Sequence, residues 1–213
     1  MISIIIPTRN EEKALQATLE DLRKLREYEY EIIVSDGKSS DRTVEIAKKY
    51  ANRVIGYSGT SRQTIGQGRN LGASVAQGAY YVFMDADVRI PDINNFFNRL
   101  VKDFEKNKNL VGATVCLKVF PAERTMADAF FFGLVNCIYY ILNNWLHIGA
   151  ASGEFQMIRN TAFTKVGGYS EKLVVGEDND LFSRLGKIGR TKIEWGLEAL
   201  HTGRRAHTIG WPK

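Results

Sequence analysis

Two aspartates near the middle of the chain have the spacing of a cation site. Asp85 and Asp87 flank Ala86 directly after the apolar run 80–84. In an extended chain, residues i and i+2 lie on the same side, so both carboxylates can converge on one hard cation. Mg2+ or Mn2+ would accept these oxygens and keep coordination positions for phosphate oxygens. The second Asp-x-Asp, at 178–180, does not follow an apolar run, so the first is the favoured metal site.

A short acidic segment, 176–181, could supply a general base. Asp178 stands three and four positions before apolar residues of the helix expected there, so it leans toward the buried face. A carboxyl group half-buried at a cleft edge has a raised pKa, which suits a general base. Acids are also favoured at helix N-termini by the helix dipole, and this explains Glu177 and Asp180 without any catalytic role.

Other polar residues could bind a nucleotide or its phosphates. Asp36 precedes a glycine at the end of an expected strand and could accept hydrogen bonds from a base or ribose, although an ordinary turn is the simpler explanation. Arg69 opens an expected helix and could clamp a phosphate with its guanidinium group. Near the chain end, Arg204 and Arg205 could bind a diphosphate and His201 could complete a metal shell; a solvated tail is the simpler explanation there too.

Alternating strand and helix patterns in the first ninety residues would position these side chains. Runs of β-branched residues predict buried strands, and amphipathic runs predict helices. The expected strands are 2–6, 31–35, 53–57 and 80–84, separated by helices that begin after residue 10, at 40–41 and at 67. This alternation predicts an α/β fold with a Rossmann-like, doubly wound, mostly parallel sheet that binds ligands at the carboxyl ends of its strands.

The second half of the chain is less regular. We expect helices at 93–107, 129–142 and 177–186, and strands at 111–119, 153–159, 192–195 and 198–201. The chain has no internal repeat, low-complexity tract or Pro/Ser-rich linker. A single domain over residues 1–213 is therefore the prediction.

Composition and charge exclude several classes of protein. An apolar fraction of 44% argues against disorder, and two cysteines argue against a disulfide scaffold. Both cysteines lie in apolar surroundings without metal spacing, which favours buried thiols in a reducing, cytoplasmic compartment. The net charge of +5 resides in residues 184–213, which favours an anionic partner such as a phosphate or an acidic membrane face, though a solvated surface is simpler. The chain has no basic stripe with interleaved aromatic residues, so nucleic-acid binding is not predicted.

The most apolar stretch is 129–142, which contains fourteen residues. A membrane-spanning helix needs ~20, so a spanning segment is not expected. Because the segment 130–145 is apolar nearly all round, it is either buried or faces lipid. A buried core helix is the favoured interpretation. The alternative, together with the basic chain end, predicts a protein peripheral to the inner face of the cell membrane.

Taken in order, these motifs resemble those of the family 2 glycosyltransferases, which have the nucleotide-sugar-binding GT-A fold. The resemblance is carried by residues 3–12, 34–43, 68–73, 83–88, 166–169, 176–181 and 203–211. It implies a donor-binding half, 1–90, and an acceptor-binding half, 91–213. It also implies that the donor is bound by Pro7, Arg9, Glu11, Asp36, Arg69, Asp85, Ala86, Asp87, Arg204 and Arg205.

Within this set, the resemblance implies that Asp85 and Asp87 form the DxD motif that holds Mn2+ or Mg2+ against the diphosphate. Asp178 matches the proposed base of inverting members. The expected reaction moves a sugar from a nucleotide-sugar, usually a UDP-sugar, to an acceptor hydroxyl by a single displacement with inversion. A polyprenyl or dolichyl phosphate is the alternative acceptor and, being ionised already, would need no base.

Two other classes of protein stay open. A nucleotidyltransferase would carry a glycine-rich basic loop after the first strand, where this chain has the acidic run 8–12. A module that binds a sugar nucleotide without turnover is not excluded, but the presence of Asp178 argues against it. The sequence also lacks the P-loop motif GxxxxGK[ST].

Overall fold

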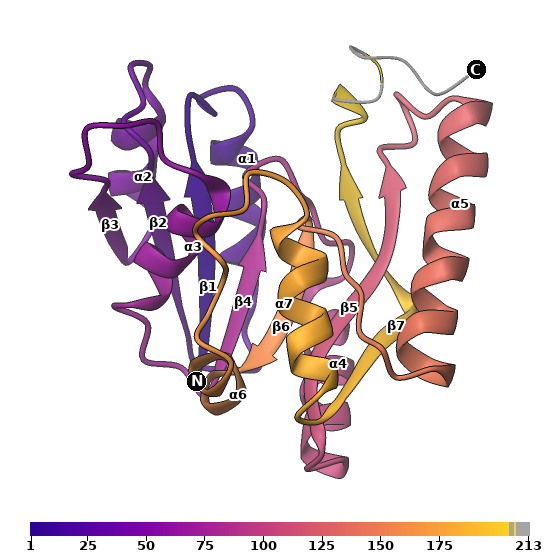
Figure 1. Ribbon diagram of the computed structural model, residues 1–213. Coiled ribbons are helices and arrows are strands. Elements are labelled where there is room, and N and C mark those ends of the chain that lie inside the picture. The colour runs from indigo at the N-terminus through magenta and orange to yellow at the C-terminus, as the bar shows by residue number, and fades with distance from the viewer. Residues whose placement is uncertain (205–206, 208–213) are drawn as a thin grey trace.

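The computed structural model describes residues 1–204 and residue 207. Its strands are β1 (Ile2–Thr8), β2 (Tyr30–Asp36), β3 (Arg53–Gly56), β4 (Tyr80–Met84), β5 (Leu110–Val119), β6 (Phe155–Arg159) and β7 (Arg190–His201). Its helices are α1 (Leu15–Leu22), α2 (Thr43–Tyr50), α3 (Ile65–Ala73), α4 (Ile93–Lys106), α5 (Met126–Tyr140), α6 (Asn160–Lys165) and α7 (Glu177–Gly186), and the π-helix η1 (Ile141–Trp145) continues α5. Among these residues, seven strands form one mixed sheet in the order β3-β2-β1-β4-β6-β5-β7 (Figure 1).

The amino-terminal half of the sheet is parallel, as predicted. β1 pairs with β2 and β4, and β2 pairs with β3. Thr8 is opposite Asp36 in this register, so the carboxyl ends of β1 and β2 meet at one edge of the sheet. β4 ends at Met84 beside them, which brings Asp85 to the same edge.

The carboxyl-terminal half departs from the parallel pattern. β6 is inserted between β4 and β5 and is antiparallel to both, and β7 then pairs with β5 in parallel. Because Phe155 is opposite Met84, the residues before β6 lie next to those after β4. The two strands predicted at 192–195 and 198–201 are one strand, whose register against β5 shifts between Val115 and Cys116.

Helices cover both faces of the sheet, which confirms the doubly wound prediction (Figure 1). One hydrophobic cluster of the described residues packs α1 and α4 against one face, with Leu19, Phe97 and Phe104 fully buried. The other packs α6 and α7 against the opposite face, with Phe83 and Phe182 at its centre. The short helix α6 was not expected from the sequence.

The prediction that the apolar segment 129–142 is a core helix is wrong. With η1 it forms a helix of 20 residues, and only 17% of its most apolar window is buried. Among the described residues, this is the one helix long and apolar enough, by length and composition alone, to cross a membrane, and it is longer than the fourteen residues expected. Cys137, predicted to be buried, is exposed on it. Hydropathy alone cannot say whether the surroundings of such a helix are protein, solvent or lipid.

Candidate active site

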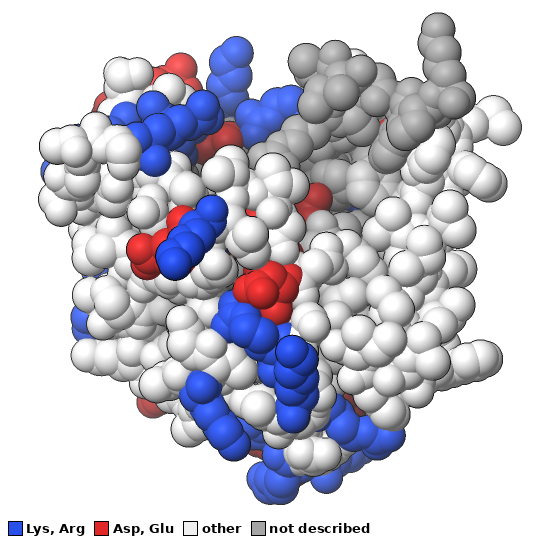
Figure 2. All heavy atoms as spheres, in the orientation of Figure 1, with Lys and Arg blue, Asp and Glu red and all other residues white. Residues whose placement is uncertain are grey.

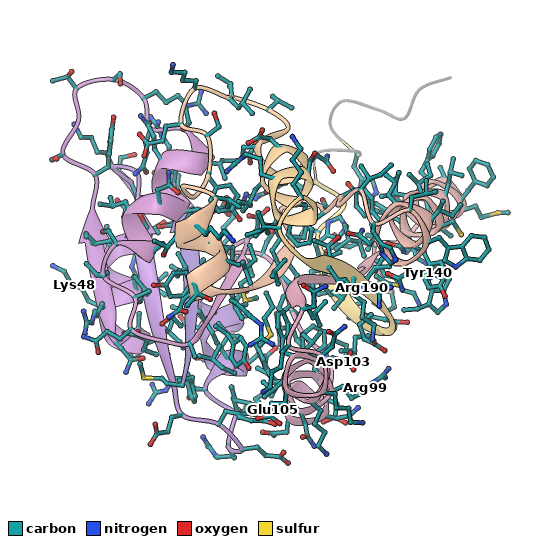
Figure 3. The ribbon with its side chains drawn as sticks, turned by 60° about the horizontal axis from the view of Figure 1, so that its bottom comes forward. Lys48, Arg99, Asp103, Glu105, Tyr140 and Arg190 are labelled. Carbon is teal, nitrogen blue, oxygen red and sulfur yellow. The ribbon has the colours of Figure 1, made fainter. Side chains whose placement is uncertain are left out.

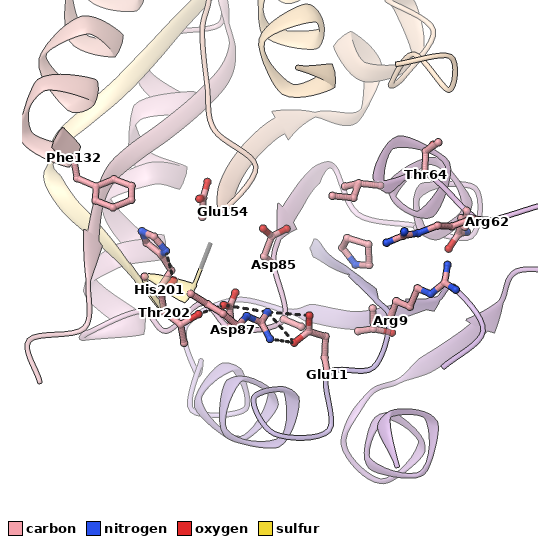
Figure 4. A pocket seen from close by; sticks show the side chains of 18 residues that line it. Arg9, Glu11, Arg62, Thr64, Asp85, Asp87, Phe132, Glu154, His201 and Thr202 are labelled. Atoms are coloured by element: carbon pink, nitrogen blue, oxygen red, sulfur yellow. Dashed lines mark hydrogen bonds and ion pairs between the residues drawn. The ribbon is translucent and has the colours of Figure 1, made fainter. Parts of the chain in front are cut away.

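A polar cavity of about 370 Å3 opens at the carboxyl edge of β1 and β4, between them and the end of β7 (Figure 4). Loops after β2, before α3 and before β6 complete its walls. The residues that line it are Pro7, Thr8, Arg9, Glu11, Gly37, Arg62, Gln63, Thr64, Ile65, Asp85, Ala86, Asp87, Phe132, Glu154, His201, Thr202, Gly203 and Arg204.

Most residues predicted from the sequence lie in this cavity. Those that line it are Pro7, Arg9, Glu11, Asp85, Ala86, Asp87, His201 and Arg204. Three predicted residues, Asp36, Arg69 and Asp178, do not line it. Arg205 lies outside the described residues.

The two aspartates of the DxD segment face the cavity with different partners. An oxygen of Asp85, Oδ1, accepts a hydrogen bond from Arg69 Nη2 at 3.1 Å. Asp87 Oδ2 accepts a hydrogen bond from the Thr202 hydroxyl and lies 3.6 Å from Arg204 Nη2. The pKa of Asp85 is raised to about 7: burial is the largest cause, Arg69 opposes it, and the charges of Glu154, Asp178 and Asp87 add to the rise.

The donor chemistry of this pair fits a divalent cation. Two carboxylates on one wall, one of them with a raised pKa, make a site where added positive charge is favourable. Within residues 1–204 and 207, no group of three His, Cys, Asp or Glu side chains could hold a metal on its own. Mg2+ commonly binds through one or two carboxylates and completes its shell with substrate phosphates and water.

Arg69 is buried beneath the cavity and binds three carboxylates. Its side chain is only 1% exposed. Nη1 donates to Glu177 Oε1 at 3.2 Å and to Asp178, while Nη2 donates to Asp85 and to the Gly153 carbonyl at 2.9 Å. The predicted contact between Arg69 and the nucleotide is therefore not supported. Its guanidinium group instead neutralises the carboxylates of Asp85, Glu177 and Asp178.

A glycine makes this buried arrangement possible. A Cβ atom at position 153 would lie 2.4 Å from Arg69 Nη2 and 2.9 Å from Asp178 Oδ2. Both distances are shorter than van der Waals contact, so any side chain at Gly153 would displace the ion pairs. Glycine at position 153, in the turn before β6, thus leaves room for Arg69 to reach Asp85 and Asp178.

Asp178 lies beside the DxD segment, as predicted, but deeper than the cavity lining. Arg69 bridges it to Asp85, and Gln156 Nε2 donates to Asp178 Oδ1 at 3.0 Å. Its neighbour Glu177, which the sequence assigned only to the helix dipole, is buried against Arg69. Burial and the Asp178 charge raise the pKa of Glu177. Nothing local in the sequence separates Glu177 from an ordinary acid at a helix start.

Asp36 has the role of a turn residue. Its carboxylate is buried and accepts hydrogen bonds from Thr8 Oγ1 at 3.1 Å, from the Ser39 hydroxyl at 2.5 Å and from the Ser39 amide at 2.9 Å. The next residue, Gly37, lines the cavity instead. The hydrogen bonds therefore support an ordinary turn at Asp36-Gly37, the simpler explanation offered by the sequence.

Several lining residues were missed by the sequence reasoning. Glu154 points into the cavity on the side of Asp85, and Phe132 of α5 closes one end with its ring 4.7 Å from that of His201 (Figure 4). Arg62 adds a cation on the opposite wall. Because Glu154 reaches the site only through the antiparallel pairing of β6 with β4, no local spacing could have identified it.

Comparison with known proteins extends these findings. The model of a family described as glycosyl transferase family 2 matches residues 3–167. The succinoglycan biosynthesis protein ExoA of Rhizobium meliloti is 30% identical over 203 residues, which cover 87% of this chain and 58% of that protein. A 4,4'-diaponeurosporenoate glycosyltransferase of Staphylococcus haemolyticus is 41% identical over 93 residues, or 42% of this chain and 24% of that protein.

Solved structures show the same GT-A fold. TarS of S. aureus superposes with a TM-score of 0.73 at 19% identity, over 94% of this chain and 36% of that one. The mannosyltransferase PcManGT of Pyrobaculum calidifontis, solved with GDP-Man and Mn2+, superposes with a TM-score of 0.70 at 17% identity, over 94% of this chain and 56% of that one. The chain thus spans less than two thirds of the length of these four proteins.

Proposed function

The chain belongs to glycosyl transferase family 2, and we propose that it moves a sugar from a nucleotide-sugar to an acceptor hydroxyl group. One observation carries the proposal: the DxD aspartates Asp85 and Asp87 face a polar cavity at the carboxyl edge of the sheet, and Arg69 bridges Asp85 to Asp178. Ligands of doubly wound folds bind at this edge. The division into a donor half, 1–90, and an acceptor half, 91–213, stays a prediction.

The proposed donor is a UDP-sugar. Arg9, Arg62 and Arg204 line the cavity, and guanidinium groups suit the recognition of a diphosphate. We assign the base and ribose to the end of the cavity formed by Pro7 and Glu11. TarS 1–349 in complex with UDP-GlcNAc has the same fold, with a TM-score of 0.69 at 21% identity, which is consistent with a nucleotide-sugar donor.

Asp85 and Asp87 would hold Mn2+ or Mg2+ with the diphosphate oxygens. When bound, the cation would stabilise the negative charge that develops on the departing UDP. Substituting Asp87→Asn should weaken Mn2+-dependent UDP binding by roughly tenfold or more, since one of two charged ligands is lost. Isothermal titration measures this, with Asp180→Asn as the matched control, because Asp180 is a half-buried carboxylate of α7 that pairs with Arg184 and does not line the cavity. Equal UDP affinity of both variants in Mn2+ would contradict this metal site.

The proposed chemistry is a single displacement with inversion. The acceptor oxygen forms a bond to the anomeric carbon while the bond from that carbon to the diphosphate oxygen breaks, and a carboxylate takes the acceptor proton. We assign the proton to Asp178. Glu154 is the competing base, because it lines the cavity whereas Asp178 lies behind Asp85 and is engaged by Arg69.

Transfer assays separate the two carboxylates. The protein is incubated with UDP-sugars and Mn2+, and released UDP is measured with and without candidate acceptors. Loss of a general base costs ~100-fold or more in kcat, so Asp178→Asn should lose this much while UDP affinity changes little. Full turnover by Asp178→Asn together with an inactive Glu154→Gln would assign the base to Glu154. Pyrophosphate release from UTP would instead reveal a nucleotidyltransferase. If no donor were turned over, the protein would be a module that binds a sugar nucleotide.

A lipid-linked phosphate is the second candidate acceptor, and one observation favours it. Phe132 lines the donor cavity, and it belongs to the helix whose other side is apolar and exposed. A phosphate acceptor is already ionised, so Asp178→Asn would then retain activity toward polyprenyl phosphate and lose it toward a saccharide hydroxyl. A position at the cytoplasmic face of a membrane would follow from such an acceptor.

A further inference from the structure

The outer face of α5 and η1 carries a continuous apolar stripe. The stripe consists of Met126, Phe130, Leu134, Ile138, Ile141 and Trp145, each at least 43% exposed. Steps of three or four residues put all of them on one side of a helix. Figure 3 shows side chains of this helix projecting away from the sheet, and Figure 2 shows the same side as an uncharged surface.

The inner face of the same helix carries the polar side chains. Asn136 is buried and exchanges two hydrogen bonds of 3.0 Å with the backbone of Leu117 in β5. Asn144 likewise accepts from Ile193 N at 2.9 Å and donates to Ile193 O at 3.2 Å in β7. A helix at a protein–water boundary has the opposite arrangement. This helix is therefore built for an apolar medium on its outer side.

The exposed side of the helix carries no charged residue, and exposed basic side chains lie just past its carboxyl end. Asp128 is the only charged residue between 126 and 145, and it is buried. Beyond η1, Lys106, Lys187 and Arg190 are exposed, and Arg190 Nη2 lies 2.9 Å from His147 Nε2. Figure 2 shows basic side chains gathered at this lower end of the molecule.

A shallow basic pocket of about 290 Å3 lies at this end of the stripe. Lys106, His147, Arg190 and Lys192 line it, together with Asp103, which accepts from Lys192 Nζ at 2.7 Å. Asn144 of η1 lines the same pocket as Arg190. The basic end is thus continuous with the apolar face.

We propose that the stripe lies in the interface of an anionic phospholipid bilayer, with Lys187, Arg190 and the basic pocket against the headgroups. An amphipathic surface with lysine and arginine at its border is typical of interfacial membrane binding. Trp145 stands at that border, where tryptophan side chains prefer to lie in membranes. The hydrogen bonds of Asn136 and Asn144 keep the helix on the sheet, so it lies along the bilayer surface and does not cross it.

A second copy of the chain fits this face less well. Each copy carries a net charge of +5, so two copies repel, whereas anionic lipid complements the basic end. Lipid binding itself does not require the transfer reaction. Its link to catalysis rests on the proposed function. Because Phe132 of this helix lines the donor cavity, a lipid-linked acceptor in the bilayer would lie close to the sugar.

Vesicle flotation tests the proposal. The protein is mixed at low salt with vesicles of phosphatidylcholine alone or with about 30% phosphatidylglycerol added. We expect flotation with the anionic vesicles, and a loss of roughly tenfold or more when Leu134 and Ile138 are both replaced by glutamate. The matched control replaces the exposed Val174 and Val175 by glutamate and should float like the wild type.

A second pair of variants tests the basic end. Substituting Lys187→Glu together with Arg190→Glu should reduce binding to anionic vesicles by roughly tenfold or more. The matched control, Lys48→Glu with Lys49→Glu on the distant α2, should leave binding unchanged. Labelling of the exposed Cys137 with a maleimide should slow on adding anionic vesicles, because the stripe beside it is covered.

Three outcomes would overturn the proposal: no flotation with anionic vesicles, flotation unchanged by the Leu134 and Ile138 substitutions, or a dimer in solution that those substitutions abolish without any vesicle binding. UDP affinity is measured on the same samples. If UDP binds but vesicles do not, only the proposed membrane surface is rejected. If vesicles bind but UDP does not, only the proposed transferase function is rejected.

Discussion

Removing the buried arginine is the sharpest test of the site. Arg69 is 1% exposed and lies within hydrogen-bond distance of Asp85, Glu177 and Asp178. Substituting Arg69→Met keeps the unbranched apolar stem of the side chain and removes the guanidinium group, which leaves three neighbouring carboxylates without their cation. Breaking a buried ion pair by removing one partner costs ~3–5 kcal/mol of the free energy of unfolding. For a chain of this size we expect the melting temperature to fall by roughly 6–20 °C.

The loss should depend on pH, with a sign fixed by the carboxylates. Burial already raises the pKa of Asp85 to about 7 and raises that of Glu177, and in both cases Arg69 opposes the shift. Without Arg69 both pKa values rise further. A carboxyl group whose pKa is higher in the folded than in the unfolded chain destabilises the fold at high pH and ceases to do so as it becomes protonated. The deficit of Arg69→Met should therefore shrink as the pH falls towards about 7, the pKa of Asp85 when Arg69 is present.

Thermal and urea denaturation at several pH values measure the effect. Arg62→Met, which removes a cation from the cavity wall instead of from beneath it, is the control and should change the free energy of unfolding by less than about 0.5 kcal/mol. The reasoning would be refuted if Arg69→Met lost less than about 1 kcal/mol near neutral pH, or if its deficit did not change with pH.

The remaining predictions concern a glycine and the two cysteines. Gly153→Ala should lower the free energy of unfolding by ~1–3 kcal/mol, since its Cβ would lie 2.4 Å from Arg69 Nη2; Gly133→Ala, with nothing within 4 Å, should be neutral or stabilising in the same urea titration. At about pH 8 a maleimide should label Cys137 quickly and Cys116 hardly at all, because burial raises the pKa of Cys116 to about 11 and leaves ~0.1% as thiolate. Mass spectrometry of peptides would contradict this if both sites reacted at equal rates.

The sequence was sufficient for the amino-terminal, parallel half of the sheet and for eight of the eighteen residues that line the cavity. The β-branched run of β1 and the apolar run of β4 are local patterns, and they predict strands whatever the rest of the chain does. Asp85 and Asp87 follow β4 directly, and parallel strands place their carboxyl ends at one edge, so the position of both aspartates followed from spacing alone.

The placement of Arg69, Glu154 and α5 was decided by the tertiary structure. β6 pairs antiparallel to β4 from a distance of more than seventy residues, and this pairing brings Gly153 and Glu154 beside the DxD segment. The apolar composition of α5 predicts a helix that avoids water but does not identify its inner side; buried amides such as Asn136 decided that by bonding to the sheet. Local patterns determine which segments become strands and helices, because they depend on near neighbours in sequence. Which charges meet, and which surface stays uncovered, depends on contacts between distant segments.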